Sequence, residues 1–212
     1  MPEFALTTLP AGSRLRSVSA DPARVAGRDA LRVSLTDEVS AGTYGVDFVD
    51  MPTFVILPVA FENGRISVDI CSRLRADAPD FARAFAGLAY RIADNGEQFE
   101  SVYLRPLNGT GLNPPPPRDK RAIQYFAYPD WKFDRLRDAH PDAYESGADI
   151  APDIWINLTV DIRGTRLTAS VDGAPVLDLA ETKAAPRSGA IGLWVDIGTE
   201  AYFSNLKVTP SD

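Results

Sequence analysis

Large polar and aromatic side chains stand out of phase with the apolar residues in several strand-like segments of this sequence. An exposed sheet face normally carries Thr, Ser, Lys and Glu, but these segments carry Arg91, Tyr103, Arg105, Gln124, Trp194 and Asp196. Aromatic planes stack on the C–H faces of sugars, and Arg, Asp and Gln side chains fork onto vicinal hydroxyl groups. Each residue taken singly is better explained by cross-strand ion pairs and aromatic ladders of a solvated sheet. Taken together they favour a pocket that binds a small molecule, with a sugar as the expected ligand.

Acid–base chemistry at such a pocket would require carboxyl groups, and the candidates are Asp69, Asp196 and Glu145. We expect Asp69 at the floor of the pocket and Glu145 or His140 entering it from a loop. Most glycosidases place two carboxylates across the scissile bond. The sequence lacks the paired Glu-x-Asp-x-x-Glu strand of jelly-roll endoglucanases, which disfavours a conventional retaining mechanism.

Several other chemistries are disfavoured by missing motifs. The sequence has no P-loop, no Gly-x-Gly-x-x-Gly turn, no nucleophile elbow and no zinc-binding HExxH helix. A single cysteine, Cys71, and a single histidine, His140, cannot supply an ordinary Cys/His zinc site. No contiguous Asp/Asn/Gly loop of the kind that binds calcium is present. We therefore predict neither a metal nor a cofactor.

The charge balance limits the class of partner. The chain of 212 residues has a formal net charge of -7, so phosphate backbones and anionic membranes are poor partners. Arg greatly outnumbers Lys among the 22 basic residues, and Arg forks suit carboxylates, phosphates and sugar hydroxyls. A GC-rich genome would give the same bias. No basic and apolar leader and no membrane-length apolar run is visible, so we expect a cytoplasmic protein.

Period-two alternation runs through most of the chain and predicts strands. Turn signals separate these strands, most clearly Asp94-Asn95-Gly96 and Asp172-Gly173. Many strands, frequent hairpins and little helical periodicity predict an all-β protein: one antiparallel β-sandwich domain over residues 1–212, with at most one or two short helices. The residues expected in its core are Ile66, Val68, Leu88, Leu104, Leu158, Val160, Leu193 and Phe203.

Two polar segments interrupt the strand pattern. Residues 108–120 contain four consecutive prolines, which form stiff backbone without amide donors. Residues 130–144 contain Trp131 and one possible short helix. Long excursions in a compact β domain are often binding loops. We expect both segments to flank the concave sheet face, with Trp131 or Tyr144 near its opening.

Several stretches resemble a bacterial family with the concanavalin A-like, laminin G-like jelly-roll fold, and more distantly the 3-keto-disaccharide hydrolase type of domain. The stretches are Asn63–Ile70, Gly87–Arg91, Phe99–Asn108, Gln124-Tyr125, Tyr144-Glu145, Gly192–Trp194 and Tyr202–Leu206. The resemblance covers most of the chain from about residue 30, and it implies the fold and a carbohydrate context. Ser67 stands where the distant hydrolases have Glu, and Trp194 where they have Gln, so no catalytic residue set is carried over.

Three functions fit these observations. The first is a hydrolase or lyase acting on a small glycoside or keto-glycoside in the groove of the concave sheet. The second is a non-catalytic carbohydrate-binding module, and the third is an enzyme that uses the groove for another class of small molecule. The fold alone does not choose among them, since jelly rolls host all three.

Overall fold

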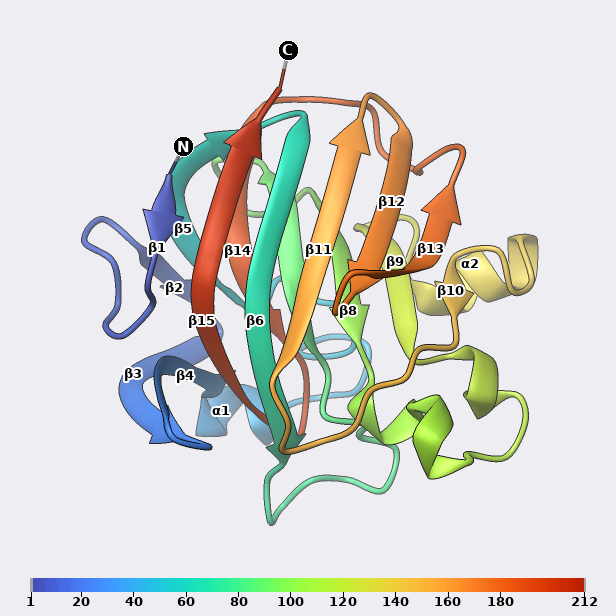
Figure 1. Cartoon of the computed structure of the whole chain (residues 1–212), viewed down its shortest axis with the longest axis horizontal. Coiled ribbons are helices and arrows are strands. Elements are labelled where there is room, and N and C mark those ends of the chain that lie inside the picture. Colours follow the sequence, from blue (N-terminus) through green and yellow to red (C-terminus); the bar gives the residue numbers. More distant parts are fainter. Residues whose placement is uncertain (1, 212) are drawn as a thin grey trace.

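Two antiparallel sheets face each other in the computed structural model, which describes residues 2–211 (Figure 1). We call the sheet at the front of Figure 1 sheet A. In spatial order its strands are β13 (Ala174–Leu179), β12 (Arg166–Val171), β11 (Ile156–Arg163), β6 (Gly64–Leu74), β15 (Thr199–Pro210), β4 (Arg28–Leu35) and β3 (Val18–Val25), with β1 (Glu3–Phe4) also paired to β15.

Sheet B lies behind it and carries the candidate site. Its strands are, in order, β10 (Glu145–Ser146), β9 (Ile123–Tyr128), β8 (Phe99–Leu104), β7 (Ala86–Ile92), β14 (Gly189–Val195), β5 (Phe54–Phe61) and β2 (Arg14–Arg16). Neighbours in both sheets are far apart in sequence, as when β14 pairs with β5 and β7. This crossing order is that of a jelly roll.

Helices are few and short, as the sequence predicts. They are α1 (Asp37–Ser40), α2 (Phe133–Ala139) and the 3-10 turns η1 (Pro106–Asn108), η2 (Thr110–Leu112) and η3 (Arg118–Lys120). α2, η2 and η3 fall in the two segments that interrupt the strand pattern, and η1 leads into the first of them. No helix in the described part of the chain is long and apolar enough to cross a membrane. The all-β antiparallel sandwich is confirmed.

The core lies between the sheets. All eight residues predicted for it are fully buried. Asp172-Gly173 forms the tight hairpin between β12 and β13, with positive φ at both residues, 49° and 82°. That conformation is the one a two-residue turn needs to match strand twist, and Asp-Gly adopts it readily.

The outer face of sheet B is covered rather than open. Cross-strand partners place Phe54, Phe99, Tyr103, Phe126 and Trp194 on this face, where their rings contact one another and are buried. Segments 44–53 and 131–139 close over them. The indole of Trp194 donates to the Met51 carbonyl at 2.9 Å, which ties the first segment to the sheet. The expected open groove is therefore replaced by a cavity at one end of sheet B.

Candidate functional site

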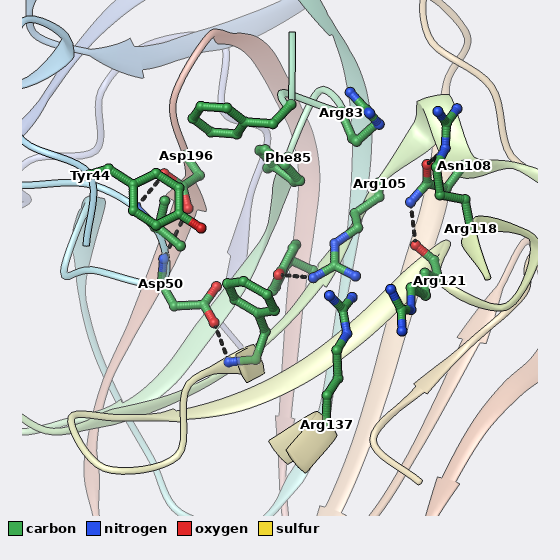
Figure 2. Close-up of a pocket in the computed structure, with 14 residues that line it drawn as sticks. Tyr44, Asp50, Arg83, Phe85, Arg105, Asn108, Arg118, Arg121, Arg137 and Asp196 are labelled. Carbon is green, nitrogen blue, oxygen red and sulfur yellow. Dashed lines mark hydrogen bonds between the residues drawn. The ribbon is translucent and has the colours of Figure 1, made fainter. Parts of the chain in front are cut away.

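A cavity of about 400 Å³ lies where β7 begins and where β8 and β14 end. Figure 2 shows carboxylates on one side of it and guanidinium groups on the other. The lining residues are Tyr44, Val49, Asp50, Phe81, Arg83, Phe85, Tyr103, Arg105, Asn108, Arg118, Arg121, Phe133, Arg137 and Asp196. Its volume is in the range typical of small-molecule sites.

The basic side is organised around one carboxylate. Glu145, at the start of β10, forms ion pairs with Arg105 at 3.2 Å, Arg121 at 3.0 Å and Arg137 at 2.6 Å. Burial alone would raise the pKa of Glu145, but the hydrogen bond to Arg137 and the three positive charges lower it overall. Three guanidinium groups thus share one ionised carboxylate, which leaves positive charge in excess.

Two further arginines add to this excess. Arg118 donates to the side-chain oxygen of Asn108 at 3.2 Å, and Arg83 donates to the carbonyl oxygens of Asp80 and Ala82, both at 2.6 Å. Neither pairs with a carboxylate within the described residues. Burial lowers the pKa of Arg83, and so do the charges of Arg118 and Arg105. Burial is the largest of these causes, and the like charges of Arg118 and Arg105 add to it because they lie near Arg83.

The acidic side consists of Asp196 and Asp50. The Asp196 carboxylate accepts hydrogen bonds from the amides of Val49 at 2.9 Å, Asp50 at 3.0 Å and Ile197 at 2.7 Å. Burial nevertheless raises the pKa of Asp196. For Asp50, burial and the neighbouring charge of Asp196 raise the pKa to about 7. A carboxyl group that titrates near neutrality in a cavity is a candidate acid–base group.

Aromatic rings form the remaining walls. Phe85, Phe133 and Tyr103 line the interior, while Tyr44 and Phe81 are 56% and 42% exposed at the rim. The rings of Tyr44 and Phe81 contact edge to face, with centroids 5.4 Å apart. Apolar planes beside charged forks suit a ligand with both C–H faces and polar groups.

The structure brings together part of the residue set predicted from the sequence. Tyr103, Arg105 and Asp196 line the cavity, and Glu145 lies directly behind Arg105. Both predicted loops reach it: Asn108 and Arg118 come from segment 108–120, whereas Phe133 and Arg137 come from segment 130–144.

Asp69 and Arg91 do not share this cavity, which corrects the prediction. Asp69 lies on the outer face of sheet A, where Arg28, Asn157 and Asn205 donate to its carboxylate at 2.7–2.9 Å. Arg91 lies at the other end of β7 and forms a buried ion pair with Glu100 at 2.8 Å. Neither side chain is placed to contact a ligand bound here.

Four other predicted residues do not line the cavity. Gln124 and Trp194 are fully buried in sheet B, and Gln124 donates to the carbonyls of Tyr125 and Tyr144. The prediction that Trp194 stacks on a ligand is therefore wrong, because segments 44–53 and 131–139 cover its ring. The guanidinium carbon of Arg135 lies 4.1 Å from the centroid of the Trp131 ring, and the ammonium nitrogen of Lys183 lies 4.8 Å from it. The ring of His140 packs against the same Trp131 ring.

Sequence reasoning missed Asp50 and the loop arginines Arg83, Arg118, Arg121 and Arg137. All five lie outside the regular strands, where alternation gives no information. The available signal was the abundance of Arg around the two long loops. Within residues 2–211 no group of three or more His, Cys, Asp or Glu side chains is placed to hold a metal ion.

No protein-family model matches this chain, and no curated protein matches it in sequence. Solved structures do share its fold. A carbohydrate-binding module, CBM66, from Bacillus subtilis is 13% identical, with a TM-score of 0.56 over 91% of this chain and 94% of that one. A putative glycosyl hydrolase from Parabacteroides distasonis is 10% identical, with a TM-score of 0.57 over the full length of both chains.

A β-glucanase from Bacillus licheniformis is likewise 10% identical, with a TM-score of 0.54 over 99% of this chain and 97% of that one. At such identities the similarity concerns the fold alone. With the strand order of the two sheets, these comparisons confirm the resemblance seen in the sequence at the level of architecture: the chain has a concanavalin A-like β-sandwich jelly-roll fold.

Proposed function

We propose that this protein is carbohydrate-active and that its cavity takes a small glycoside or keto-glycoside carrying a negative charge. The observation that carries the proposal is the convergence of five arginines on the cavity, with one carboxylate, Glu145, paired to three of them. Guanidinium forks match carboxylate, sulfate and phosphate oxygens in geometry and charge. The net charge of the chain is -7, so this positive cavity is a local feature.

A sugar is favoured over other anions by the aromatic walls and by the fold. Phe85, Phe133 and the rim residues Tyr44 and Phe81 offer planes for the C–H face of a pyranose. The cavity of about 400 Å³ suits a mono- or disaccharide. The compared structures include a carbohydrate-binding module, a putative glycosyl hydrolase and a β-glucanase, which supports the same ligand class.

Catalysis by hydrolysis or elimination is the finer part of the proposal, and it is supported by the carboxyl group of Asp50. Burial and the charge of Asp196 bring the pKa of Asp50 to about 7, where a group both accepts and donates protons. A non-catalytic binding module would use the same arginines without needing such a carboxyl group.

Arg118→Gln is expected to weaken binding of a uronate sugar about tenfold or more. A hydrogen bond to a charged group contributes about 1.5–3 kcal/mol, and Arg118 is half-buried at the cavity wall with no carboxylate partner among residues 2–211. Isothermal titration with glucuronate, galacturonate and their disaccharides would measure the change. Rising ionic strength should weaken binding by the parent protein.

Arg163→Gln is the matched control. Arg163 is exposed at the end of β11 on sheet A, outside the cavity, so its loss should leave affinity unchanged. The proposal fails if neutral glucose and galactose disaccharides bind as tightly as the uronates. It also fails if Arg118→Gln and Arg163→Gln have equal affinity.

A further inference from the structure

The loop that carries Asp50 is held in an unusual backbone conformation. Val49 and Asp50 have φ values of 77° and 53°, in the left-handed region that non-glycine residues, and β-branched ones above all, adopt at a cost. The Asp196 carboxylate accepts from the amides of both residues. Asp196 thus fixes the loop so that the Asp50 side chain lies against the cavity, as Figure 2 shows.

Asp50 differs from the other carboxylates of the site in its partners. One of its oxygens accepts from the Phe133 amide at 2.7 Å, and Tyr103 lines the same cavity. No Lys or Arg nitrogen of the described residues lies within 4.0 Å of it. Its charge is therefore not locked in an ion pair, in contrast to Glu145.

This distribution of partners argues against hydrolysis by two carboxylates. The usual glycosidase needs a carboxylic acid and a second carboxylate as base or nucleophile. Glu145 is committed to three arginines, and Asp196 to three backbone amides. Of the carboxyl groups that the structure describes at the cavity, Asp50 remains the one available to exchange a proton with a ligand.

We infer that the cavity catalyses β-elimination on a uronate glycoside, with Asp50 as the base and Tyr103 as the acid; this inference rests on the proposed function. The Asp50 carboxylate takes the proton from the carbon next to the substrate's carboxylate. The electron pair of that C–H bond forms a carbon–carbon double bond as the bond to the leaving oxygen breaks. The arginines stabilise the negative charge that develops on the substrate's carboxylate.

Tyr103 completes the proton balance. Its hydroxyl accepts a hydrogen bond from Arg105, and Tyr103 and Asp50 both line the cavity. Burial raises the pKa of Tyr103 well above its ordinary value, so the phenol stays protonated and serves as an acid. Tyr103 protonates the leaving oxygen. After the products leave, Asp50 gives its proton to solvent and Tyr103 takes one from solvent, so the proton count is unchanged. The products are an unsaturated uronide and a free sugar hydroxyl, with no oxidant or reductant involved.

The test follows elimination and binding separately on uronate disaccharides and short oligouronides. Elimination creates a conjugated double bond that absorbs in the ultraviolet, whereas hydrolysis creates a reducing end without it. Asp50→Asn and Tyr103→Phe should each lower turnover at least about 100-fold while affinity changes less than about threefold. Asp178→Asn, at an exposed carboxylate of sheet A, should leave turnover unchanged.

The outcomes separate the two proposals. If the parent protein binds uronates and releases reducing ends without ultraviolet absorbance, or converts nothing, elimination is overturned while the proposed binding stands. If no uronate binds, both are overturned. If Asp50→Asn does not fold, Tyr103→Phe decides, since it removes only a hydroxyl group, and undiminished elimination by that variant would refute the acid–base assignment.

Discussion

Replacing Arg91 with alanine is expected to lower the free energy of unfolding by about 3–5 kcal/mol. Arg91 is 1% exposed, and its guanidinium group pairs with the equally buried Glu100 at 2.8 Å. Removing one partner of a buried ion pair leaves the other charge without compensation in a medium of low dielectric constant. Urea denaturation followed by tryptophan fluorescence would measure the loss.

The remaining contacts of Arg91 explain why the effect should be large. It also donates to the Glu62 and Gly164 carbonyls, both at 2.8 Å, and to the Asn63 side chain at 3.1 Å. These acceptors belong to the turns at one end of sheet A, so one side chain joins the two sheets. Burial raises the pKa of Glu100 even with Arg91 present. Loss of Arg91 would raise it further.

A control variant and a compensating double variant test this expectation. Arg166→Ala breaks an exposed ion pair with Asp178 and should cost less than about 1 kcal/mol. Adding Glu100→Gln to Arg91→Ala should restore part of the stability by removing the unpaired charge. A cost for Arg91→Ala no greater than that for Arg166→Ala would show that the pair is not structural.

The misplacement of Arg91 shows where alternation stops being informative. Leu88 and Tyr90 alternate with Ala89 and Arg91 in the sequence, which places Arg91 on the outer face of sheet B. In the structure, the register between β14 and β7 shifts near this point, and Arg91 has a φ of 52°. A bulge of this kind turns the side chain toward the space between the sheets. A period-two pattern in the sequence does not predict such a bulge.

Asp69 illustrates a different limit. The pattern correctly places Asp69 opposite the core residue Val68. A sandwich, however, has two outer faces, and alternation within a strand does not say to which sheet the strand belongs. That depends on pairing: β6 lies between β11 and β15 in sheet A. Tyr103 and Asp196 were placed well because both belong to strands of sheet B that end at the cavity.

The fold was predictable because its determinants are local. Alternation identified the eight core residues, and Asp172-Gly173 identified a hairpin from two residues. Asp50 was not predictable in the same way. It lies in a loop, and its proximity to Tyr103 and Asp196 arises from contacts across about 50 and 150 residues of chain.

Asp50→Asn is expected to stabilise the folded protein at pH 8 while abolishing turnover. The pKa of Asp50 is about 7 in the folded state, against an ordinary value of 3.8. Between these values the folded state binds a proton that the unfolded state lacks, so this group's contribution to stability is full below about pH 4 and is lost as the pH rises through 7. Asparagine does not titrate, so the variant avoids this loss, which amounts to at most about 4 kcal/mol.

The neighbours of Asp50 fix the sign of the effect. Burial comes first and Asp196 second in raising the pKa of Asp50, whereas the Phe133 amide, Arg105 and Tyr103 lower it.

Denaturation of parent and variant between pH 5 and pH 8 should show a stability difference that grows with pH in favour of Asp50→Asn. The exposed Asp178→Asn should show no such trend. A difference that stays constant with pH would mean that Asp50 is ionised throughout this range, and it would refute the proton-transfer role of Asp50. If the difference does grow, the protein retains at this position a carboxyl group that weakens its fold at neutral pH, as expected of a residue kept for chemistry rather than for stability.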